Sequence, residues 1–122
     1  MNRDNMYDVI IIGGGPAGLS VASELSKELK VLVVEKDTAG KTDRSWFVPL
    51  DVANQNEDII KFTYGGVTRY LASTFSGGDL SWDVKQFERY PFIKEKELLP
   101  YWVDVIKSNG SDIINKCFYQ NH

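Results

Sequence analysis

The sequence contains few of the residues that form metal centres and disulfide bonds. Its 122 residues include one cysteine, Cys117, and one histidine, His122. A single cysteine cannot form an internal disulfide, and no spacing typical of zinc ligands occurs, so we expect no metal site and assign no catalytic role to His122. Cys117 lies in an apolar-rich run, which predicts a buried thiol in a reducing compartment and favours the cytoplasm.

The sequence also lacks a strong charge and a long hydrophobic run. A net charge of -3 provides no basic patch for nucleic acid, so no nucleic-acid partner is expected. The apolar run Val9 to Ile12 is too short for a signal-peptide core or a membrane span. With 43% hydrophobic and 25% charged residues, the composition fits an ordinary globular domain.

What is present begins with a strand-helix-strand pattern. Tyr7 to Ile12 is a β-branched run of the kind that forms a parallel strand buried on both faces. Small and apolar residues then recur at helical spacing, at Gly18, Ala22, Leu25 and Leu29. This spacing predicts a helix from about Pro16 to Leu29. Val31 to Val34 is a second apolar run, so the segment predicts a βαβ unit.

The turn between the first strand and the helix carries the motif G-x-G-x-x-G. Gly13 permits the tight turn, Gly15 lets the backbone approach a pyrophosphate, and Gly18 lets the helix pack closely on the strand. Pro16 suits the first helical position, because its missing N–H would have no intrahelical partner there. The helix N-terminus favours an anion. The predicted cofactor-binding loop comprises Gly13, Gly14, Gly15, Pro16, Ala17 and Gly18.

An acidic residue follows this motif at the expected place. Glu35 ends the second strand, close to the spacing of about 20 residues at which such an acid binds the ribose hydroxyls of a dinucleotide. A carboxylate there repels a 2′-phosphate, which favours FAD or NAD over NADP. The alternatives are a purely steric glycine turn and a solvated charge that closes the strand.

The residues YDVIIIGGGPAGLSVASEL and KVLVVEK resemble the N-terminus of FAD-dependent oxidoreductases. Within that class the segment is similar to the group of geranylgeranyl reductases, lycopene cyclases and p-hydroxybenzoate-hydroxylase-type monooxygenases. The resemblance covers about the first third of the chain. It implies that the glycine loop surrounds the FAD pyrophosphate, Glu35 binds the adenosine ribose, Lys36 lies beside the adenine, and Arg44 lies near the cofactor phosphates. A solvated arginine remains the alternative for Arg44.

The predicted fold class is α/β, a Rossmann-type FAD- or NAD(P)-binding βαβ unit with a short antiparallel β element. We expect an FAD-binding unit over residues 1–50. Residues 51–122 are expected to form a partial substrate-domain hairpin plus a helix and a strand that return to the FAD-binding layer. Such relatives usually have glycine between the first helix and the second strand, where this chain has Glu28. The helix is therefore expected to end without a glycine cap.

Beyond the second strand the pattern is weaker. Residues 37–56 are rich in turn formers and read as an irregular excursion. The segment IIKFTYGGVTRYLASTF, which starts at Ile59, contains two β-rich runs that are expected to form strands. Gly65-Gly66 between them predicts the turn of an antiparallel hairpin, and Gly77-Gly78 predicts a turn after it. A helix is expected from about Glu97 to Ser108, with Pro100 tolerated in its first turn and Asn109-Gly110 as its end. Asp112 to Tyr119 is expected to form a further strand.

Other candidate residues have ordinary structural explanations. Trp82 and Trp102 are expected in the core, whereas Trp46, in the irregular excursion, is a candidate for a substrate pocket. The mixed charges of residues 94–97 predict a solvated helix entry. No nucleophile, base or metal constellation occurs, so no catalytic residue is assigned, and the reactive chemistry would belong to the flavin.

The resemblance implies redox chemistry on an apolar or aromatic small molecule. It also implies that the chain is incomplete, because the family's second cofactor motif has no counterpart in it. A homo-oligomer or a completing partner chain is therefore expected. The other hypotheses are a nucleotide-binding module that holds only the ADP half, an oligomerising interaction protein, and an NAD-dependent dehydrogenase.

Overall fold

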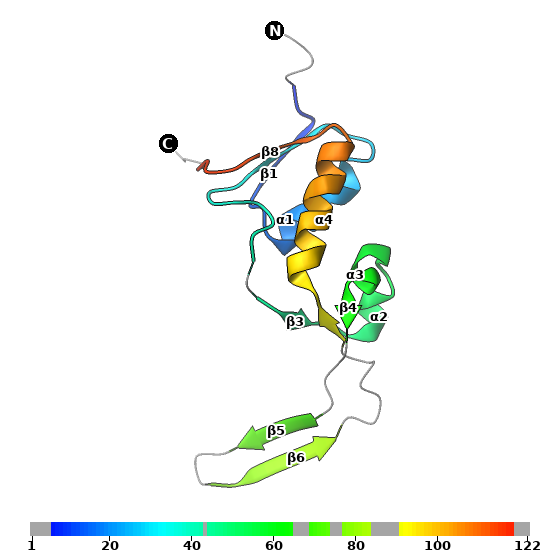
Figure 1. The fold of residues 1–122 in the computed structure, drawn as a ribbon, viewed down its shortest axis with the longest axis vertical. Helices are drawn as coiled ribbons and strands as arrows, with labels where there is room; N and C mark the ends of the chain where they lie inside the picture. Colours follow the sequence, from blue (N-terminus) through cyan, green and yellow to red (C-terminus); the bar gives the residue numbers. More distant parts are fainter. Residues whose placement is uncertain (1–5, 43, 65–68, 74–76, 84–90, 119–122) are drawn as a thin grey trace. The chain divides into compact units, whose positions relative to one another are not determined.

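A computed structural model describes residues 6–42, 44–64, 69–73, 77–83 and 91–118 (Figure 1). The chain divides into two compact units. The first combines Met1–Asp43 with Lys96–His122, and the second is Arg44–Glu95. The glycine motif lies in the first unit.

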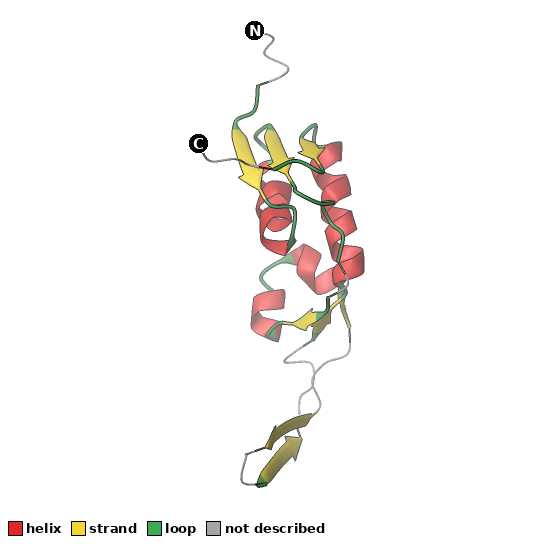
Figure 2. Cartoon of the chain, turned by 90° about the vertical axis from the view of Figure 1, so that its left-hand side faces the viewer, coloured by secondary structure: helices red, strands yellow, loops and turns green. Residues whose placement is uncertain are grey.

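The first unit is built on a parallel sheet of three strands. β1 (Val9–Ile12) leads through α1 (Pro16–Leu25) to β2 (Val31–Val34), which confirms the predicted βαβ pattern. The third strand, β8 (Asp112–Ile114), follows α4 (Glu95–Ser108) and pairs with β2, so the strand order is β1-β2-β8 (Figure 2). Both chain segments of this unit therefore meet in one sheet.

The sheet of the first unit has one buried and one exposed side. Val31 and Val33 of β2 are fully buried, as a β-branched parallel strand requires. On β1, by contrast, Ile10 is 60% exposed and Ile12 is 58% exposed. The prediction that this first strand is buried on both faces is therefore wrong for the described part of the chain. Alternate side chains of a strand point to opposite faces, so a continuous apolar run does not reveal which faces are covered.

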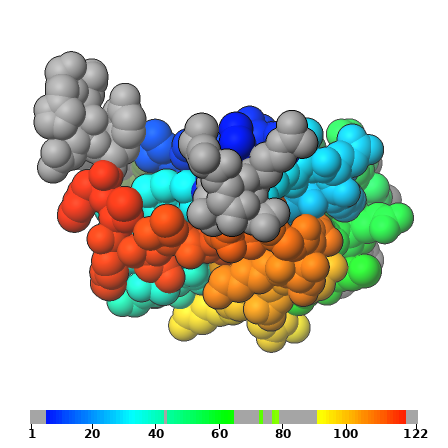
Figure 3. Space-filling model, turned by 90° about the horizontal axis from the view of Figure 1, so that it is seen from above, coloured from blue at the N-terminus to red at the C-terminus, as the bar shows by residue number. Residues whose placement is uncertain are grey.

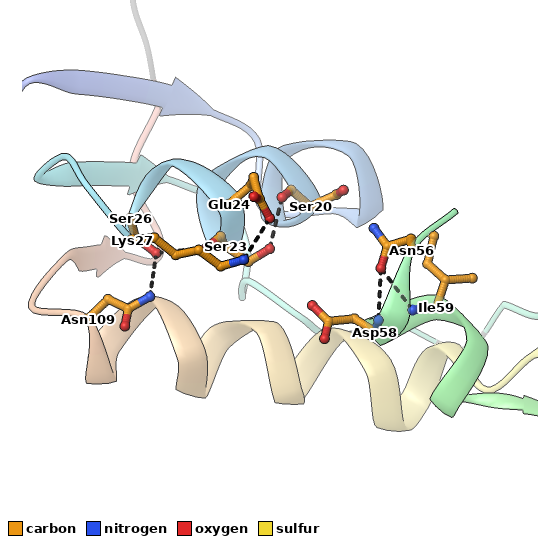
Figure 4. A network of polar contacts seen from close by, with 9 residues as sticks. All are labelled: Ser20, Ser23, Glu24, Ser26, Lys27, Asn56, Asp58, Ile59 and Asn109. Atoms are coloured by element: carbon orange, nitrogen blue, oxygen red, sulfur yellow. Dashed lines mark hydrogen bonds and ion pairs between the residues drawn. The ribbon is translucent and has the colours of Figure 1, made fainter. Parts of the chain in front are cut away.

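Helix α1 ends four residues earlier than predicted, at Leu25 instead of Leu29. A series of turn hydrogen bonds replaces the last helical turn, including one from Leu29 N to Leu25 O at 2.9 Å. The Ser26 hydroxyl donates to Ser23 O and accepts a hydrogen bond from the Asn109 amide at the end of α4 (Figure 4). These bonds satisfy backbone groups at the helix end without a left-handed residue, so Glu28 causes no strain there.

Helix α4 begins two residues before the predicted start, at Glu95. Pro100 therefore lies in its second turn, not its first, and the ring removes one backbone hydrogen bond. The buried side chains of α4 follow helical spacing and are Leu98, Leu99, Trp102 and Ile106. Trp102 is 2% exposed, as predicted for a core residue. Gly110 ends the segment with a φ of 87°, which confirms the predicted stop.

The second unit contains two small antiparallel sheets. In the first, β3 (Trp46–Phe47) and β4 (Thr63–Tyr64) flank β7 (Phe92–Ile93). The second sheet pairs β5 (Arg69–Ser73) with β6 (Asp79–Asp83), and Trp82 lies in β6. A short antiparallel β element is therefore present, as predicted.

The pairing of these strands corrects the predicted hairpin. Residues 65–66 lie outside the described part of the chain, but β4, which precedes them, pairs with β7 instead of with β5. The hairpin partner of β5 is β6, on the other side of Gly77, whose φ is 89°. Both glycine pairs suit a hairpin turn, and the local sequence does not distinguish them.

The excursion of residues 37–56 contains more regular structure than predicted. Besides β3 it holds α2 (Leu50–Ala53), and α3 (Glu57–Lys61) follows it directly. Asn56 caps α3, because its Oδ1 accepts hydrogen bonds from Asp58 N and Ile59 N at 2.9 and 3.1 Å (Figure 4). Ile59 to Lys61, read from the sequence as strand, is therefore helical. The sequence signal for this helix start was an asparagine, Asn56, followed by two acidic residues.

Candidate functional site

The glycine loop connects the end of β1 to the start of α1. Gly13 adopts a φ of 111°, a conformation that L side chains rarely take, and its N–H donates to Val34 O of β2 at 2.8 Å. Pro16 is the first residue of α1, as predicted. The loop therefore turns sharply at the carboxyl ends of β1 and β2, where open α/β sheets bind their ligands.

Gly14 and Gly18 lack side chains for reasons internal to the protein. A Cβ atom on Gly18 would overlap the carbonyl oxygen of Gly13, so helix and loop could not approach as they do. A Cβ on Gly14 would lie 2.7 Å from the Cβ of Ala39. These two glycines are thus required by packing, which is the role predicted for Gly18.

Gly15 differs from both. It precedes α1 with a φ of -92°, which any residue can adopt, and a Cβ there would meet no atom of the described residues within 4 Å. In the part of the chain that the structure describes, neither backbone conformation nor packing requires glycine at this position. The space in front of Gly15, at the N-terminus of a ten-residue helix, therefore fits a close-approaching anion such as a phosphate.

Glu35 links the glycine loop to the end of β2. Its Oε1 accepts a hydrogen bond from Gly14 N at 2.9 Å, and its Oε2 accepts one from Asp37 N at 2.6 Å. These two bonds, that from Gly14 first, hold the pKa of the Glu35 carboxyl below its ordinary value. Each carboxylate oxygen has a further lone pair, so ribose hydroxyls can still donate to it. The sequence did not reveal that Glu35 also holds the loop.

The segment after β8 also forms hydrogen bonds and an ion pair with the residues that follow β2. Cys117 N donates to Glu35 O at 2.9 Å, and Ala39 N donates to Asn115 Oδ1 at 2.8 Å. Lys116 Nζ lies 2.7 Å from Asp37 Oδ1, and this ammonium lowers the pKa of the Asp37 carboxyl. In Figure 3 the red C-terminal segment lies against the cyan surface that continues β2. Sequence reasoning missed the contacts of Asn115, Lys116 and Cys117, because it placed these residues inside a strand predicted from Asp112 to Tyr119, whereas β8 ends at Ile114.

A cavity of about 320 Å³ opens beside this junction. It lies at the carboxyl ends of β1 and β2, and Glu35 and the predicted adenine neighbour Lys36 both line it. The remaining lining residues are Ile12, Gly13, Val34, Cys117 and Phe118. Phe118 is 70% exposed, and Cys117 is partly exposed instead of fully buried as predicted. The structure thus brings one glycine of the loop, the acid and the lysine together at one cavity; their contacts with a cofactor remain a prediction.

Arg44, the last predicted cofactor residue, belongs to the second unit. Its Nη2 lies 3.7 Å from Oε1 of Glu95, and its side chain is 70% exposed. Glu95 itself is 1% exposed, so the prediction of a solvated charge run over residues 94–97 is wrong at this position. Within the described ranges, no cluster of three His, Cys, Asp or Glu residues is placed to hold a metal ion, and no helix is long and apolar enough to cross a membrane.

Comparison with known proteins agrees with this arrangement. Residues 8–47 match the family of FAD dependent oxidoreductases. Over an 82-residue alignment the chain is 34% identical to a rifampicin monooxygenase of Streptomyces venezuelae, which covers 63% of this chain but 17% of that protein. The chain therefore spans about a sixth of the length of this relative.

Solved structures share the fold at low identity. A geranylgeranyl bacteriochlorophyll reductase-like protein from Thermoplasma acidophilum superposes with a TM-score of 0.63 at 23% identity, over 90% of this chain and 30% of its own. The flavin-dependent monooxygenase PieE, crystallised with FAD and substrate, gives 0.65 at 20% identity, over 90% of this chain and 24% of its own. These matches confirm the predicted Rossmann-type fold. The family match of residues 8–47 confirms the resemblance to FAD-dependent oxidoreductases, whose cofactor is FAD.

Proposed function

We propose, for a chain whose residues 8–47 match the FAD-dependent oxidoreductases, that the glycine loop and Glu35 bind the ADP part of FAD. The observation that carries this proposal is the open space at Gly15. A glycine that neither packing nor φ demands, at the N-terminus of α1, is explained by a ligand that must approach the backbone closely.

Each residue of the loop region would contribute a defined interaction. The N-terminus of α1 carries partial positive charge and would stabilise the diphosphate. Glu35, held by Gly14 N and Asp37 N, would accept hydrogen bonds from the adenosine ribose without reorienting. Lys36, which lines the cavity, would lie beside the adenine. FAD, when bound, would supply the redox chemistry, and the protein would supply binding and orientation.

The finer parts of the proposal rest on the resemblance. We assign Arg44 to the cofactor phosphates, residues 1–50 to FAD binding, and residues 51–122 to a partial substrate region with a helix and strand that return to the FAD-binding layer. The substrate is an apolar or aromatic small molecule, and Trp46 is a candidate for its pocket. A homo-oligomer or a completing partner chain would enclose the rest of the flavin.

Calorimetric titration of the full chain with FAD and with ADP tests the proposal. We expect both ligands to bind the wild type, and Gly15→Val to weaken both at least about tenfold, because the added side chain fills the space where the phosphates must approach. Thermal unfolding of the variant controls for damage to the fold. Its melting temperature should be close to that of the wild type, since a Cβ at Gly15 meets no atom among the described residues.

The outcomes separate the competing functions. Unchanged affinity in Gly15→Val would remove the loop from the binding site and overturn the proposal. Equal affinity for FAD and ADP would favour the nucleotide-binding module that holds only the ADP half. Much tighter binding of FAD would show that the chain also contacts the flavin side, and reduction of that flavin by an added reductant would then test for an oxidoreductase.

A further inference from the structure

The first strand of the parallel sheet is also one of its edges. In the order β1-β2-β8, β1 pairs with β2 on one side, and among the described residues no strand pairs with its other side (Figure 2). Gly13 N, directly after β1, donates to Val34 O on the β2 side. Backbone groups of successive residues in a strand point to opposite sides, so the N–H and C=O groups of Ile10 and Ile12 point to the open edge.

The open edge of β1 carries none of the features that usually protect such an edge. Charged residues, proline or a bulge commonly keep edge strands from pairing with other chains, whereas β1 has the sequence VIII and an unbroken register with β2. Its side chains Ile10 and Ile12 are exposed on the outer face of the sheet. The opposite edge strand, β8, has three residues and begins with the charged Asp112. Of the two edges, β1 is therefore the one to which a further strand can add.

The pattern of β1 makes a second copy of this chain a suitable occupant. Two β1 strands related by a two-fold axis at Ile11 run antiparallel, and each copy then places Ile10 opposite Ile12 of the other. Because these two residues point their backbone groups to the open edge, each such pair exchanges two N–H to C=O hydrogen bonds. Residues that lie opposite each other share a face, so the exposed isoleucine side chains of both copies contact one another.

Charge does not oppose this pairing. In the same register Val9 lies opposite Gly13 of the other copy, and Asp8 lies opposite Gly14. No two like charges therefore face each other along the paired strands. The Asp8 carboxylate also accepts a hydrogen bond from Lys30 N of its own chain at 2.8 Å, so it has a partner before the copies meet.

We propose that the chain forms a symmetric dimer through β1, in which the two three-stranded sheets join into one continuous sheet. A two-fold axis pairs the same edge of both copies, so association through β1 stops at the dimer. The contact involves one strand of four residues from each copy, and a contact of this size is weak. The inference does not depend on the proposed function.

Sedimentation equilibrium of the full chain at increasing concentration tests the dimer. We expect a dissociation constant of about 10–100 µM for the wild type. Ile10→Lys places a charge on the edge and should raise this constant at least about tenfold. Ile114→Lys is the matched control, because Ile114 is also exposed on the outer face but lies on β8. Its dissociation constant should stay within about threefold of the wild-type value.

Hydrogen exchange of the wild type, followed for each amide by NMR, tests the geometry of the contact. Raising the protein concentration through the range of dimer formation should slow exchange of the Ile10 and Ile12 N–H groups at least about fivefold. Exchange of the Ile11 N–H, which already points to β2, should change much less. Stacking of two sheets through their outer faces would not produce this alternation, because it forms no backbone hydrogen bonds.

Several results would overturn the proposal. One is a monomer at every concentration up to about 500 µM. Equal weakening by Ile10→Lys and Ile114→Lys, or exchange without the alternation, assigns the contact to another surface. Growth beyond the dimer contradicts the closed two-fold pairing. If the melting curve shows that Ile10→Lys does not fold, the exchange pattern of the wild type decides alone. A dimer that fails to bind FAD overturns the proposed function and leaves the dimer standing.

Discussion

The first unit builds its sheet from strands of three or four residues joined by helices of ten or more, whereas the sheet of β3, β7 and β4 in the second unit has strands of two residues each. In the first unit, hydrophobic runs and helical spacing specify each element locally. In the second, elements this short depend on the partner against which they pair. The difference teaches that the glycine loop lies between elements that the local sequence specifies, whereas the position of Arg44 depends on pairing between segments far apart in the sequence.

The strongest test of the local scaffold is Gly18→Ala. Its methyl group would overlap the Gly13 carbonyl, so helix or strand must move, and we expect a loss of about 3 kcal/mol in the free energy of unfolding. Gly15→Ala is the matched control and should cost less than about 1 kcal/mol, because a Cβ there meets no atom in the described segments. Urea denaturation measures both, and similar losses would show that the two glycines do not differ in role.

The junction at Glu35 predicts a smaller, pH-dependent effect. Glu35→Gln should cost about 1–2 kcal/mol at pH 7, because an amide cannot accept both backbone hydrogen bonds. The Glu35 pKa is lowered in the fold, so its contribution is present above the ordinary value of 4.5 and is lost as the pH falls through the folded value.

Unfolding curves recorded from pH 7 to pH 3 measure this dependence. The wild type should lose stability in the acid range. Glu35→Gln should lose less, because the variant has no carboxyl group at this position to be protonated. Lys116 also lowers the pKa of the Asp37 carboxyl, so Asp37 contributes to the pH dependence in the same sense as Glu35. Asp37→Asn should therefore remove a separate part of the loss of stability in acid. Parallel profiles of stability against pH for the wild type and Glu35→Gln would contradict the assignment of this pH dependence to Glu35.

In the second unit, the cap of α3 is the sharpest local signal. Asn56→Ala removes two hydrogen bonds to backbone N–H groups and should lower the free energy of unfolding by about 1 kcal/mol. Asn54→Ala, at an exposed position before the helix, is the control and should have less effect. Equal values for the two variants, measured by thermal unfolding, would mean that packing alone holds this helix.

The smallest effect is expected at Lys116, which adopts a φ of 58°. A left-handed conformation is strained for any residue with a Cβ, and glycine relieves that strain at the cost of a more flexible unfolded chain. Lys116→Gly should therefore be more stable than Lys116→Ala by about 0.5 kcal/mol. Both variants lose the exposed ion pair with Asp37, so their difference in denaturation midpoint isolates the backbone term.

The sequence predicted the first unit well because its signals are local. The apolar runs, the helix spacing and the glycine motif each specify a few neighbouring residues, and the structure confirms β1, α1, β2 and the steric role of Gly18. The errors concern long-range choices. Two glycine pairs suited a hairpin, and only pairing decided between them. The burial of Glu95 depends on the tertiary fold, which a mixed charge run does not reveal.

The position of Cys117 has a practical consequence. It is the single cysteine of the chain, and it lines the same cavity as Gly13 and Glu35. A thiol-selective reagent can therefore modify one side chain only, and that side chain borders the proposed nucleotide site. The rate of its labelling, followed as ligand is added, reads the occupancy of the cavity directly, without an engineered probe or a coloured cofactor.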